Sequence, residues 1–266
     1  MTKRELKYLI KSRSFKFAKD INDKSHRITS LTWNNKKVHY RTSSSDMVLI
    51  YEILLKSKFR REYYFPKEIN PKVIFDIGGN IGITSIYLSS LFPNAKIYSF
   101  EPLKENFEIL QKNISQFPNI KGLNIGLGAN NGTFKVYPSD NDENYGGVSF
   151  FSEVEGSLNE SFAECNVKNV NDVIEELGIP SVDLIKIDTE GAEYDILTSI
   201  KTEFLEKTSW ITGELHGNRD FEVLNYLNDL DFSISMKKNI DNRLFMFNAG
   251  KEEIISQINR KEIKIL

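Results

Sequence analysis

From residue 71 onward, short apolar runs alternate with segments in which apolar residues recur every three or four positions. The runs are typical of strands buried on both faces of a parallel sheet, and the periodic segments are typical of amphipathic helices. The sequence predicts strands over 73–75, 96–100, 122–127, 133–137, 182–187 and 210–215. It predicts helices over 83–92, 103–117, 170–177, 192–204 and 221–230. Because strands that alternate with helices form right-handed βαβ units, we expect an α/β fold with a mainly parallel sheet.

The two ends of the chain carry a different pattern. Segments 232–236 and 243–247 alternate around a polar turn, which predicts a closing β-hairpin that adds an antiparallel strand to the sheet. Near the N-terminus the pattern predicts a strand pair over 31–40 that turns at Asn34–Asn35, and a helix from Asp46. We therefore expect an N-terminal accessory region over 1–70, a main domain over 71–250 and a C-terminal tail over 251–266 with a surface helix at 251–260.

A long polar segment over 141–157 is rich in Asn, Gly, Asp and Ser. Loops of this length in compact domains are often lids or binding segments, so residues around Tyr145 could cover a substrate. A surface loop without such a role is the alternative.

Composition narrows the function classes. The chain has 266 residues, 40% of them hydrophobic, and a formal net charge of −2, so it can fill a large core but carries no basic field for nucleic acid. The single cysteine, Cys165, excludes an internal disulfide and fits a reducing compartment. No run approaches the roughly 18 apolar residues of a transmembrane helix, and the N-terminus lacks the pattern of a signal peptide. We therefore expect a cytoplasmic protein without a membrane-spanning segment.

The first candidate site follows the first predicted strand, where the sequence reads Phe-Asp-Ile-Gly-Gly-Asn-Ile-Gly from residue 75 to residue 82. Glycines let the backbone turn tightly and approach a ligand, and the next helix points free N–H groups at the same place. The spacing does not match the Gly-x-Gly-x-x-Gly of dinucleotide sites. Instead Asp76 stands at the strand end, where it would repel a pyrophosphate but suit a ligand with an ammonium group and a sulfonium. That is the charge pattern of S-adenosylmethionine, so we predict that Asp76, Gly78, Asn80 and Gly82 bind this cofactor.

A second acid, Glu101, ends the second predicted strand, 19 residues after Gly82. An acid at this place can accept hydrogen bonds from both ribose hydroxyls, a device that NAD-binding sites also use. The alternative is that Glu101 caps the next helix and that Asp76 is only a turn acid. The combination of both acids favours an adenosyl ligand.

The most polar strand end lies at residues 182–193. Side chains alternate along a strand, so Lys186 and Asp188 project from the same face. A Lys on a buried strand is costly unless it is paired, so Lys186 is either part of a structural ion pair or a contact for the substrate. We expect Asp188, at the strand tip, to face the methyl group that is transferred. The acids here could also bind a divalent metal, but no His-rich ligand set accompanies them, so no metal is predicted.

These segments resemble the FkbM-type methyltransferases. Members carry an Asp-x-Gly-x-Asn-x-Gly turn, which stands here at 76–82, and a Lys-Ile-Asp-x-Glu-Gly-x-Glu segment, which stands at 186–193. The Phe-Glu-Pro at 100–102 also fits, and Gly79 departs from the alanine that is frequent in the family. The resemblance covers about residues 46–248. It implies a Rossmann-like class I methyltransferase fold and O-methylation of a hydroxyl, often on a sugar or natural product.

The remaining candidates follow the other predicted strands. Glu214 and His216 are two positions apart, so they point the same way, and His is the natural base near neutral pH. The family often shows Glu-x-His here, which favours His216 as the general base; the alternative is a structural hydrogen bond. By analogy with the fold, Asn124 and Gly126 are expected to border the adenine.

The sequence therefore predicts an O-methyltransferase in which a hydroxyl attacks the methyl carbon in line and Asp188 or His216 takes its proton. Lys186 and Glu214 complete the predicted catalytic set. The acceptor, the oligomeric state and the pathway are not encoded in these motifs. Two alternatives stay open: an NAD-dependent oxidoreductase or epimerase, and a non-catalytic interaction module on the same fold.

Overall fold

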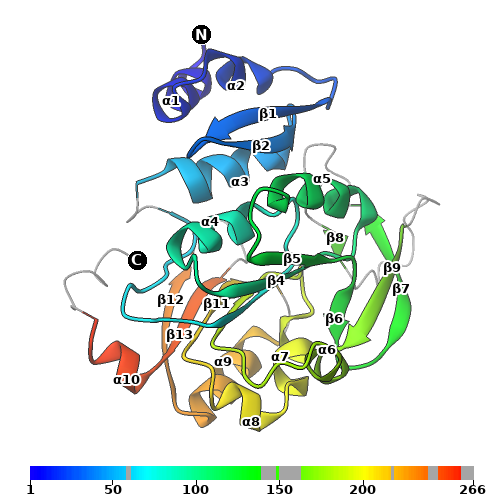
Figure 1. Ribbon diagram of the computed structural model, residues 1–266, viewed down its shortest axis with the longest axis vertical. Coiled ribbons are helices and arrows are strands. Elements are labelled where there is room, and N and C mark those ends of the chain that lie inside the picture. The colour runs from blue at the N-terminus through cyan, green and yellow to red at the C-terminus, as the bar shows by residue number, and fades with distance from the viewer. Residues whose placement is uncertain (58–60, 139–147, 150–162, 217–218, 239–244, 259–266) are drawn as a thin grey trace.

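The computed structural model describes residues 1–57, 61–138, 148–149, 163–216, 219–238 and 245–258. A seven-stranded sheet lies at the centre of the molecule (Figure 1) and consists of β3 (Val73–Ile77), β4 (Lys96–Phe100), β5 (Ile120–Leu123), β10 (Leu184–Ile187), β11 (Trp210–Leu215), β12 (Phe232–Lys238) and β13 (Phe245–Lys251). The strand order is β12-β13-β11-β10-β3-β4-β5. Neighbouring strands from β11 to β5 are parallel, whereas β13 runs antiparallel to both β11 and β12. The predicted Rossmann-like α/β fold, with its mainly parallel sheet and closing hairpin, is confirmed.

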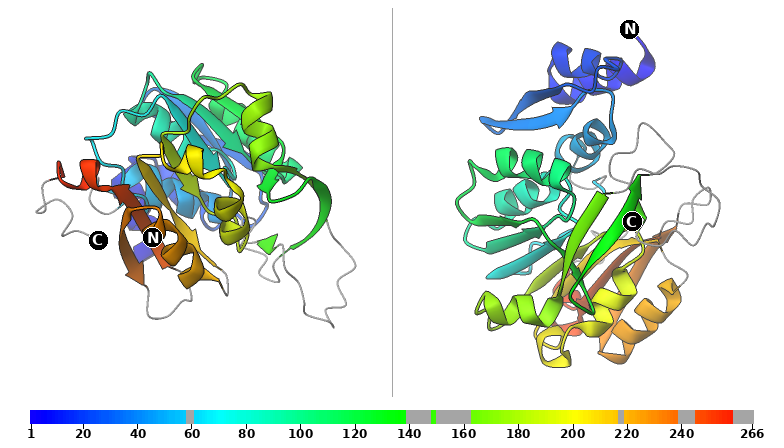
Figure 2. Two further views of the ribbon diagram at one scale, coloured as in Figure 1. Left: turned by 90° about the horizontal axis from the view of Figure 1, so that it is seen from below. Right: turned by 90° about the vertical axis from the view of Figure 1, so that its right-hand side faces the viewer.

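Different helices cover the two faces of this sheet, because side chains alternate along each strand. Ile74 and Leu184 point into one apolar cluster, and Phe75 and Ile185 point into the other. The first face is covered by α4 (Ile83–Leu91) and α5 (Lys104–Ile114), and the second by α6 (Val170–Glu176), α7 (Glu193–Ser199), α8 (Thr202–Leu205) and α9 (Asp220–Asp229) (Figure 2). Burial on both faces explains the continuous apolar runs of the central strands.

The N-terminal region stacks on α4 and α5 (Figure 1). It contains α1 (Lys3–Ser12), α2 (Phe15–Asp20), β1 (Ile28–Trp33), β2 (Lys36–Arg41), α3 (Ser45–Leu49) and a π-helix, η1 (Ile50–Leu55). The predicted hairpin is confirmed: β1 and β2 pair antiparallel, and Asn34 and Asn35 adopt φ of 47° and 62° in its turn. The helix predicted from Asp46 exists, but it changes to π-helical geometry at Ile50.

Buried polar contacts fix the N-terminal region to the sheet domain. Arg41 forms a buried ion pair with Asp46, and the same guanidinium donates to Asn106 Oδ1 on α5 at 2.8 Å. The Asn113 side chain, also on α5, accepts from the His39 N–H at 2.6 Å and donates to the His39 carbonyl at 3.0 Å. One hydrophobic cluster spans α1, the hairpin, α3 and α4. The region is therefore packed onto the sheet domain, and the boundary at residue 70 stays a prediction.

Some predicted elements are divided in the structure. The strand predicted over 122–127 is two strands, because the chain turns between β5 and β6 (Gly126–Gly128) and β6 joins a second sheet. That sheet has the order β6-β9-β7-β8, and its other members are β7 (Gly132–Pro138), β8 (Val148–Ser149) and β9 (Ala163–Asn169). The strand at β9 was not predicted. Likewise the helix predicted over 192–204 is divided into α7 and α8.

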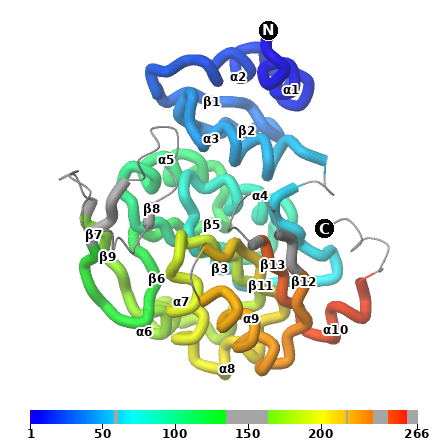
Figure 3. The backbone as a smooth tube through the Cα atoms, turned by 180° about the vertical axis from the view of Figure 1, so that it is seen from behind, coloured from blue at the N-terminus to red at the C-terminus, as the bar shows by residue number. Residues whose placement is uncertain are grey.

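The second sheet lies beside β5, at the edge of the molecule opposite the hairpin (Figure 3). At the hairpin side, α10 covers only Glu252–Ile255, which is shorter than the helix predicted over 251–260. Residues 139–147 and 150–162 of the long polar segment lie outside the described residues, so its predicted role around Tyr145 stays untested. Among the helices described, none combines the length and apolar character needed to cross a bilayer.

Candidate functional site

A cavity of about 870 Å³ lies at the carboxyl ends of β3, β4 and β10. This is the edge at which open α/β sheets bind ligands. Its walls include the turn after β3, Glu101 after β4, Lys186 and Asp188 of β10 and its exit, and Glu214 on β11. The N-terminal region closes the cavity with residues of α3, η1 and the segment at 61–63. The sheet thus brings together predicted site residues from four strand ends, and the N-terminal region adds a wall that the motifs did not predict.

The turn after β3 has the tight geometry that its glycines predicted. Gly78 has a φ of 78°, and a Cβ at this position would lie 1.8 Å from the Asp188 carbonyl oxygen. Gly78 and Gly79 donate their N–H groups to the Phe100 carbonyl at 3.1 and 2.8 Å. The turn is therefore held between β10 and β4, and its exposed side lines the cavity. Gly82, with a φ of 84°, is the N-cap of α4 and is not among the lining residues.

Asp76 lies below the turn rather than in the cavity wall. Its side chain is fully buried, and Oδ2 accepts from Ser85 Oγ at 2.5 Å. Oδ1 lies 3.5 Å from Lys186 Nζ, which in turn donates to the Gly78 carbonyl at 2.7 Å. Burial alone would lower the pKa of Lys186, but the carboxylates of Asp76 and Asp188 outweigh it and raise that pKa. Asp76 thus holds a charged lysine under the turn, and the position does not support the predicted direct contact with a cofactor.

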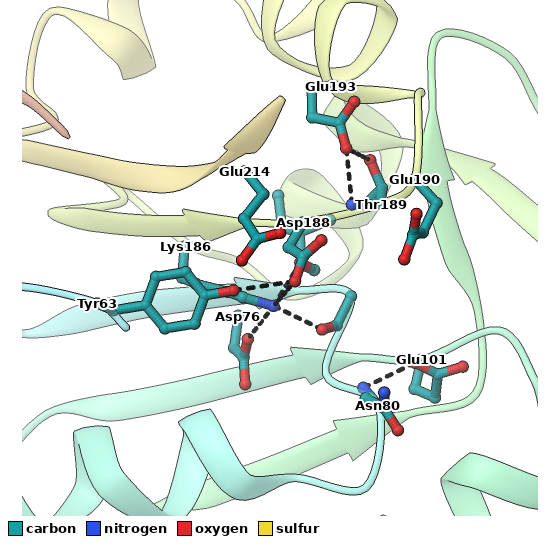
Figure 4. Close-up of polar contacts among 12 residues, drawn as sticks. Tyr63, Asp76, Asn80, Glu101, Lys186, Asp188, Thr189, Glu190, Glu193 and Glu214 are labelled. Atoms are coloured by element: carbon teal, nitrogen blue, oxygen red, sulfur yellow. Dashed lines mark hydrogen bonds and ion pairs between the residues drawn. The ribbon is translucent and has the colours of Figure 1, made fainter. Parts of the chain in front are cut away.

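Glu101 lines the cavity and also braces the turn (Figure 4). Its Oε2 accepts from the Asn80 N–H at 2.8 Å, and its Oε1 accepts from the Leu103 N–H at 2.9 Å. Burial raises the pKa of Glu101 to about 7, although these two hydrogen bonds oppose the shift. Glu101 therefore fixes the chain just before α5 and also lines the cavity, and its contact with a ribose stays a prediction. The carboxylate also lines the cavity, where a ligand hydroxyl could reach its remaining lone pairs.

Asp188 stands at the centre of the polar wall (Figure 4). Its Oδ2 accepts from the Tyr63 hydroxyl at 2.9 Å and lies 3.8 Å from Lys186 Nζ. Burial raises the pKa of Asp188, and the charge of Lys186 only partly offsets this effect. A buried carboxylate with a raised pKa is a better proton acceptor than a solvated one.

His216 lies behind this wall and is surrounded by acids. Nδ1 is 3.3 Å from Glu193 Oε1, and Nε2 is 3.4 Å from Glu214 Oε2, 3.7 Å from Glu190 Oε2 and 3.8 Å from Asp188 Oδ1. Burial would lower the pKa of His216, but the hydrogen bonds to Glu193 and Glu214 outweigh it and raise the pKa to about 11. An imidazolium has no lone pair to accept a proton, so the geometry favours Asp188 over His216 as the base.

The donor atoms of Asp188, Glu193 and His216 lie within 4.8 Å of one another, a spacing that a divalent cation requires. Glu193 already accepts from the Thr189 N–H at 2.8 Å and from the Gly191 N–H at 3.0 Å. The imidazolium supplies positive charge at the same place. These three residues are therefore a candidate cation site that the motifs did not indicate, and the absence of a metal stays a prediction.

The N-terminal segment contributes Glu62 and Tyr63, which the sequence motifs did not indicate. Tyr63 is buried, and Glu62 lines the cavity together with Glu214. Burial and the neighbouring Glu214 raise the pKa of Glu62. The segment has no motif character; its only sequence signal is the aromatic run Tyr63–Phe65. The contacts depend on tertiary packing and could not be predicted from spacing.

The residues that were predicted to border the adenine, Asn124 and Gly126, differ in their position at the turn between β5 and β6. Gly126 lines the cavity together with the residues that follow it, as far as Asn130. Asn124 is exposed, does not line the cavity, and donates its side-chain amide to the Glu101 carbonyl at 2.9 Å and to the Pro102 carbonyl at 3.0 Å. The structure therefore places Asn124 as a brace of the turn rather than as a wall of the cavity.

Comparison with known proteins identifies the family. Residues 76–239 match the methyltransferase FkbM domain. The chain belongs to this family. The predicted resemblance is confirmed, and the match is to methyltransferases rather than to the NAD-dependent enzymes that the sequence left open.

Relatives of this FkbM-family chain include much longer and similarly sized proteins. It is 26% identical over 230 residues to the AMB antimetabolite synthetase AmbE of Pseudomonas aeruginosa, an alignment that covers 73% of this chain and 10% of AmbE. It is 26% identical over 170 residues to the hexuronic acid methyltransferase AglP of Haloferax volcanii, covering 62% of this chain and 65% of AglP. The chain thus spans about a tenth of the first relative and less than two thirds of the second.

Among solved structures, the methyltransferase FkbM of Methylobacillus flagellatus aligns with a TM-score of 0.47 and 18% identity, over 68% of this chain and 44% of that protein.

Proposed function

We propose that this FkbM-family chain is an S-adenosylmethionine-dependent O-methyltransferase that acts on a hydroxyl of a sugar, glycan or natural product. The observation that carries the proposal is a single cavity that joins the glycine turn and Glu101 to the carboxylate of Asp188. An adenosyl ligand suits the first end, and a hydroxyl that must lose a proton suits the second. A relative named as a hexuronic acid methyltransferase supports a carbohydrate acceptor. Another, the 2-O-methyltransferase NoeI of Sinorhizobium fredii, supports transfer to a hydroxyl.

The residues at the turn fit a cationic adenosyl ligand. Asn80 lines the cavity, and its Oδ1 is buried without a hydrogen-bond partner within the part of the chain that the structure describes. Buried acceptors are normally satisfied, so this oxygen is suited to an ammonium group of a ligand. Glu101 would hold the ribose hydroxyls, and Gly126 would border the base. Asp76 and Gly82 would act indirectly, by fixing Lys186 and the start of α4.

The chemistry needs a base and a closed environment. When bound, the cofactor supplies an electrophilic methyl group for an in-line displacement. Asp188 would accept the proton of the attacking hydroxyl, while Tyr63 and Lys186 hold its carboxylate in place. The electrostatic potential at this carboxylate would be set by the charged groups behind it, which are Glu214, Glu193 and His216. Orientation of two reactants in a dehydrated site contributes up to roughly 7–11 kcal/mol in well-aligned systems.

The test begins with binding and then measures transfer. Calorimetry with S-adenosylhomocysteine should show one site per chain, and radiolabelled S-adenosylmethionine should label an alkyl glycoside in the presence of the protein. If S-adenosylhomocysteine does not bind, the proposal is contradicted and the alternative of a non-catalytic interaction module is favoured.

A further inference from the structure

The outward face of α1 combines exposed apolar side chains with lysines. We infer that this face, which consists of Lys3, Leu6, Lys7 and Ile10, docks the protein on an anionic lipid surface. None of these residues lines the cavity, so the inference goes beyond the proposed function and does not depend on it. Figures 1 and 3 show α1 at one end of the molecule, beyond the β1–β2 hairpin, and α8 at the other end.

The opposite face of α1 holds the helix in place. Glu5 and Tyr8 are buried, and Glu5 Oε1 accepts from Lys19 Nζ on α2 at 3.0 Å. The Tyr8 ring stacks on the rings of Phe17 and Tyr51, with centroids 5.5 and 4.9 Å away. These contacts fix α1 to α2 and η1, and they leave its outward face toward solvent.

The outward face is a single stripe. Residues three and four positions apart lie on the same side of a helix, as these four residues do. Leu6 and Ile10 are 45% and 65% exposed, and neither belongs to the apolar cluster that α1 shares with η1. The fold therefore does not need aliphatic side chains at these two positions. Apolar residues flanked by lysines are typical of helices that lie in a membrane interface.

Charge complementarity favours an anionic surface as the occupant. Residues 1–19 contain seven basic residues and one acid, a formal charge of +6, so the rest of the chain carries −8 of a total of −2. Lys3, Lys7 and Lys11 form no ion pair within the ranges that the structure describes. An anionic surface would attract this end of the molecule and repel the remainder, which sets the orientation of docking.

The aliphatic side chains distinguish a lipid surface from other occupants. A nucleic acid binds basic side chains through its phosphates and gains little from Leu6 and Ile10. A bilayer with anionic lipids accommodates both kinds of residue, because its headgroups attract lysines and its acyl boundary accepts apolar side chains. A second copy of this chain would present the same basic face, and like charges in an interface repel each other.

Co-sedimentation of the whole chain with vesicles tests the inference. Vesicles of phosphatidylcholine with about 30 mol% phosphatidylserine should bind the protein at least about tenfold more tightly than pure phosphatidylcholine, since each cation near such a surface contributes about fivefold. Raising NaCl from about 0.1 M to about 0.5 M should release the protein, because salt screens this attraction. Equal binding to both kinds of vesicle, or binding to neither, would overturn the inference.

Apolar variants test the part played by the aliphatic side chains. Leu6→Gln combined with Ile10→Gln keeps the charge and the helix propensity, and should weaken binding to the anionic vesicles by at least about tenfold. Phe221→Gln is the matched control, because Phe221 is 66% exposed on α9 and lies outside the α1 face. It should leave vesicle binding unchanged. If both variants bind as tightly as the wild type, the α1 face does not enter the bilayer.

Lysine variants test the charge with the same design. Lys3→Gln combined with Lys7→Gln should weaken binding to the anionic vesicles by about 20-fold. Lys201→Gln combined with Lys207→Gln removes the same charge from exposed residues next to α8, at the other end of the molecule, and should change binding less than about twofold. Equal losses in the two double variants would show that net charge, and not the α1 face, governs binding.

Two further measurements separate the other occupants. Sedimentation velocity should show the same oligomeric state for the wild type and the Leu6→Gln, Ile10→Gln variant; a dimer lost in that variant would assign the face to a second copy. Binding to duplex DNA as tight as binding to anionic vesicles would indicate a general polyanion site and would also overturn the inference. Calorimetry with S-adenosylhomocysteine should give the wild-type affinity in every α1 variant, so the proposed function is tested separately.

Discussion

At the scale of single residues, the site is a set of carboxylates. The hydrogen-bond and ion-pair partners of each carboxylate decide its role. Glu101 accepts two backbone N–H groups, Asp188 accepts from a tyrosine, and Glu193 and Glu214 contact one imidazolium. The sequence shows all of these as acids at strand ends. The partners determine which acid keeps a proton near neutral pH and which stays charged.

Glu101 is predicted to control cofactor affinity. Glu101→Gln should weaken S-adenosylhomocysteine binding by about 10- to 100-fold, because a hydrogen bond to a charged group contributes about 1.5–3 kcal/mol. The pKa of about 7 predicts that wild-type affinity falls between pH 8 and pH 6, since protonation removes the charged acceptor. Calorimetry at both pH values checks this. An equal pH dependence in Glu101→Gln would assign the effect to another group.

Asp188 is predicted to be the base. Asp188→Asn should lower kcat by about 100-fold or more, in the range of general-base removal, while cofactor affinity changes little. His216→Gln should lower kcat less than Asp188→Asn does, because the ring is already protonated. Single-turnover rates with labelled cofactor measure both variants. A larger loss of kcat in His216→Gln than in Asp188→Asn would indicate that His216 is the base.

Metal removal is predicted to leave the reaction intact. Exhaustive dialysis against EDTA should leave kcat within about twofold, since His216 already lies among the carboxylates that a cation would bind. The measurement is transfer activity before and after dialysis, with Mg²⁺, Mn²⁺ or Zn²⁺ added back. Loss of activity that one of these cations restores would establish a metal at Asp188, Glu193 and His216.

At the scale of elements, the turn between β3 and α4 links the strand to the cofactor end of the cavity. Its conformation needs glycine at residue 78 for two reasons, a φ of 78° and the Asp188 carbonyl at the place of a Cβ. Sequence reasoning predicted this turn because glycine spacing is a local signal. It did not predict the division of 122–127 into β5 and β6, because the turn at Asn124 depends on carbonyls of the chain after β4.

Gly78→Ala is predicted to destabilise the fold strongly. The added Cβ would lie 1.8 Å from a backbone oxygen, so β10 or the turn must shift. Gly178→Ala is the matched control: its φ is 61°, but no atom lies within 4 Å of the added Cβ, so only the left-handed strain of about 1–2 kcal/mol applies. Thermal unfolding compares the two. If the two variants lose the same thermal stability, the contact between the added Cβ and the Asp188 carbonyl is relieved at little cost in free energy.

At the scale of the whole molecule, the N-terminal region and the sheet domain share one cavity and one apolar cluster. The contacts from Arg41 and His39 to α5 fasten the N-terminal region, of which Glu62 and Tyr63 are part, to the sheet domain. This arrangement couples the charge state of the site to folding, because the acids and His216 come from elements that meet only in the folded chain.

Stability is predicted to fall as pH rises above neutral. The folded-state pKa of His216, about 11, exceeds the ordinary 6.5, so the folded chain keeps a proton that the unfolded chain releases. The stabilisation is complete below pH 6.5 and is lost as pH rises toward 11, by about 1.4 kcal/mol per pH unit for one proton. Denaturant unfolding of wild type and His216→Gln from pH 7 to pH 9 should give curves that converge. A constant difference between them would contradict the shift.

The sequence alone determined the alternation of strands and helices, the glycine turn and the acids at the strand ends, because these depend on local periodicity and on conformations available to glycine. It also carried the paired motifs at 76–82 and 186–193 that indicate the family. Only the tertiary structure decided that Asp76 supports Lys186 instead of lining the cavity, and that His216 holds a proton. It alone brought Glu62 and Tyr63 of the N-terminal region into the cavity that Asp188 and Glu214 line, across a separation that no motif spans. The physical reason is that proton affinity and burial depend on which side chains meet in space, and sequence spacing does not specify such contacts between distant segments.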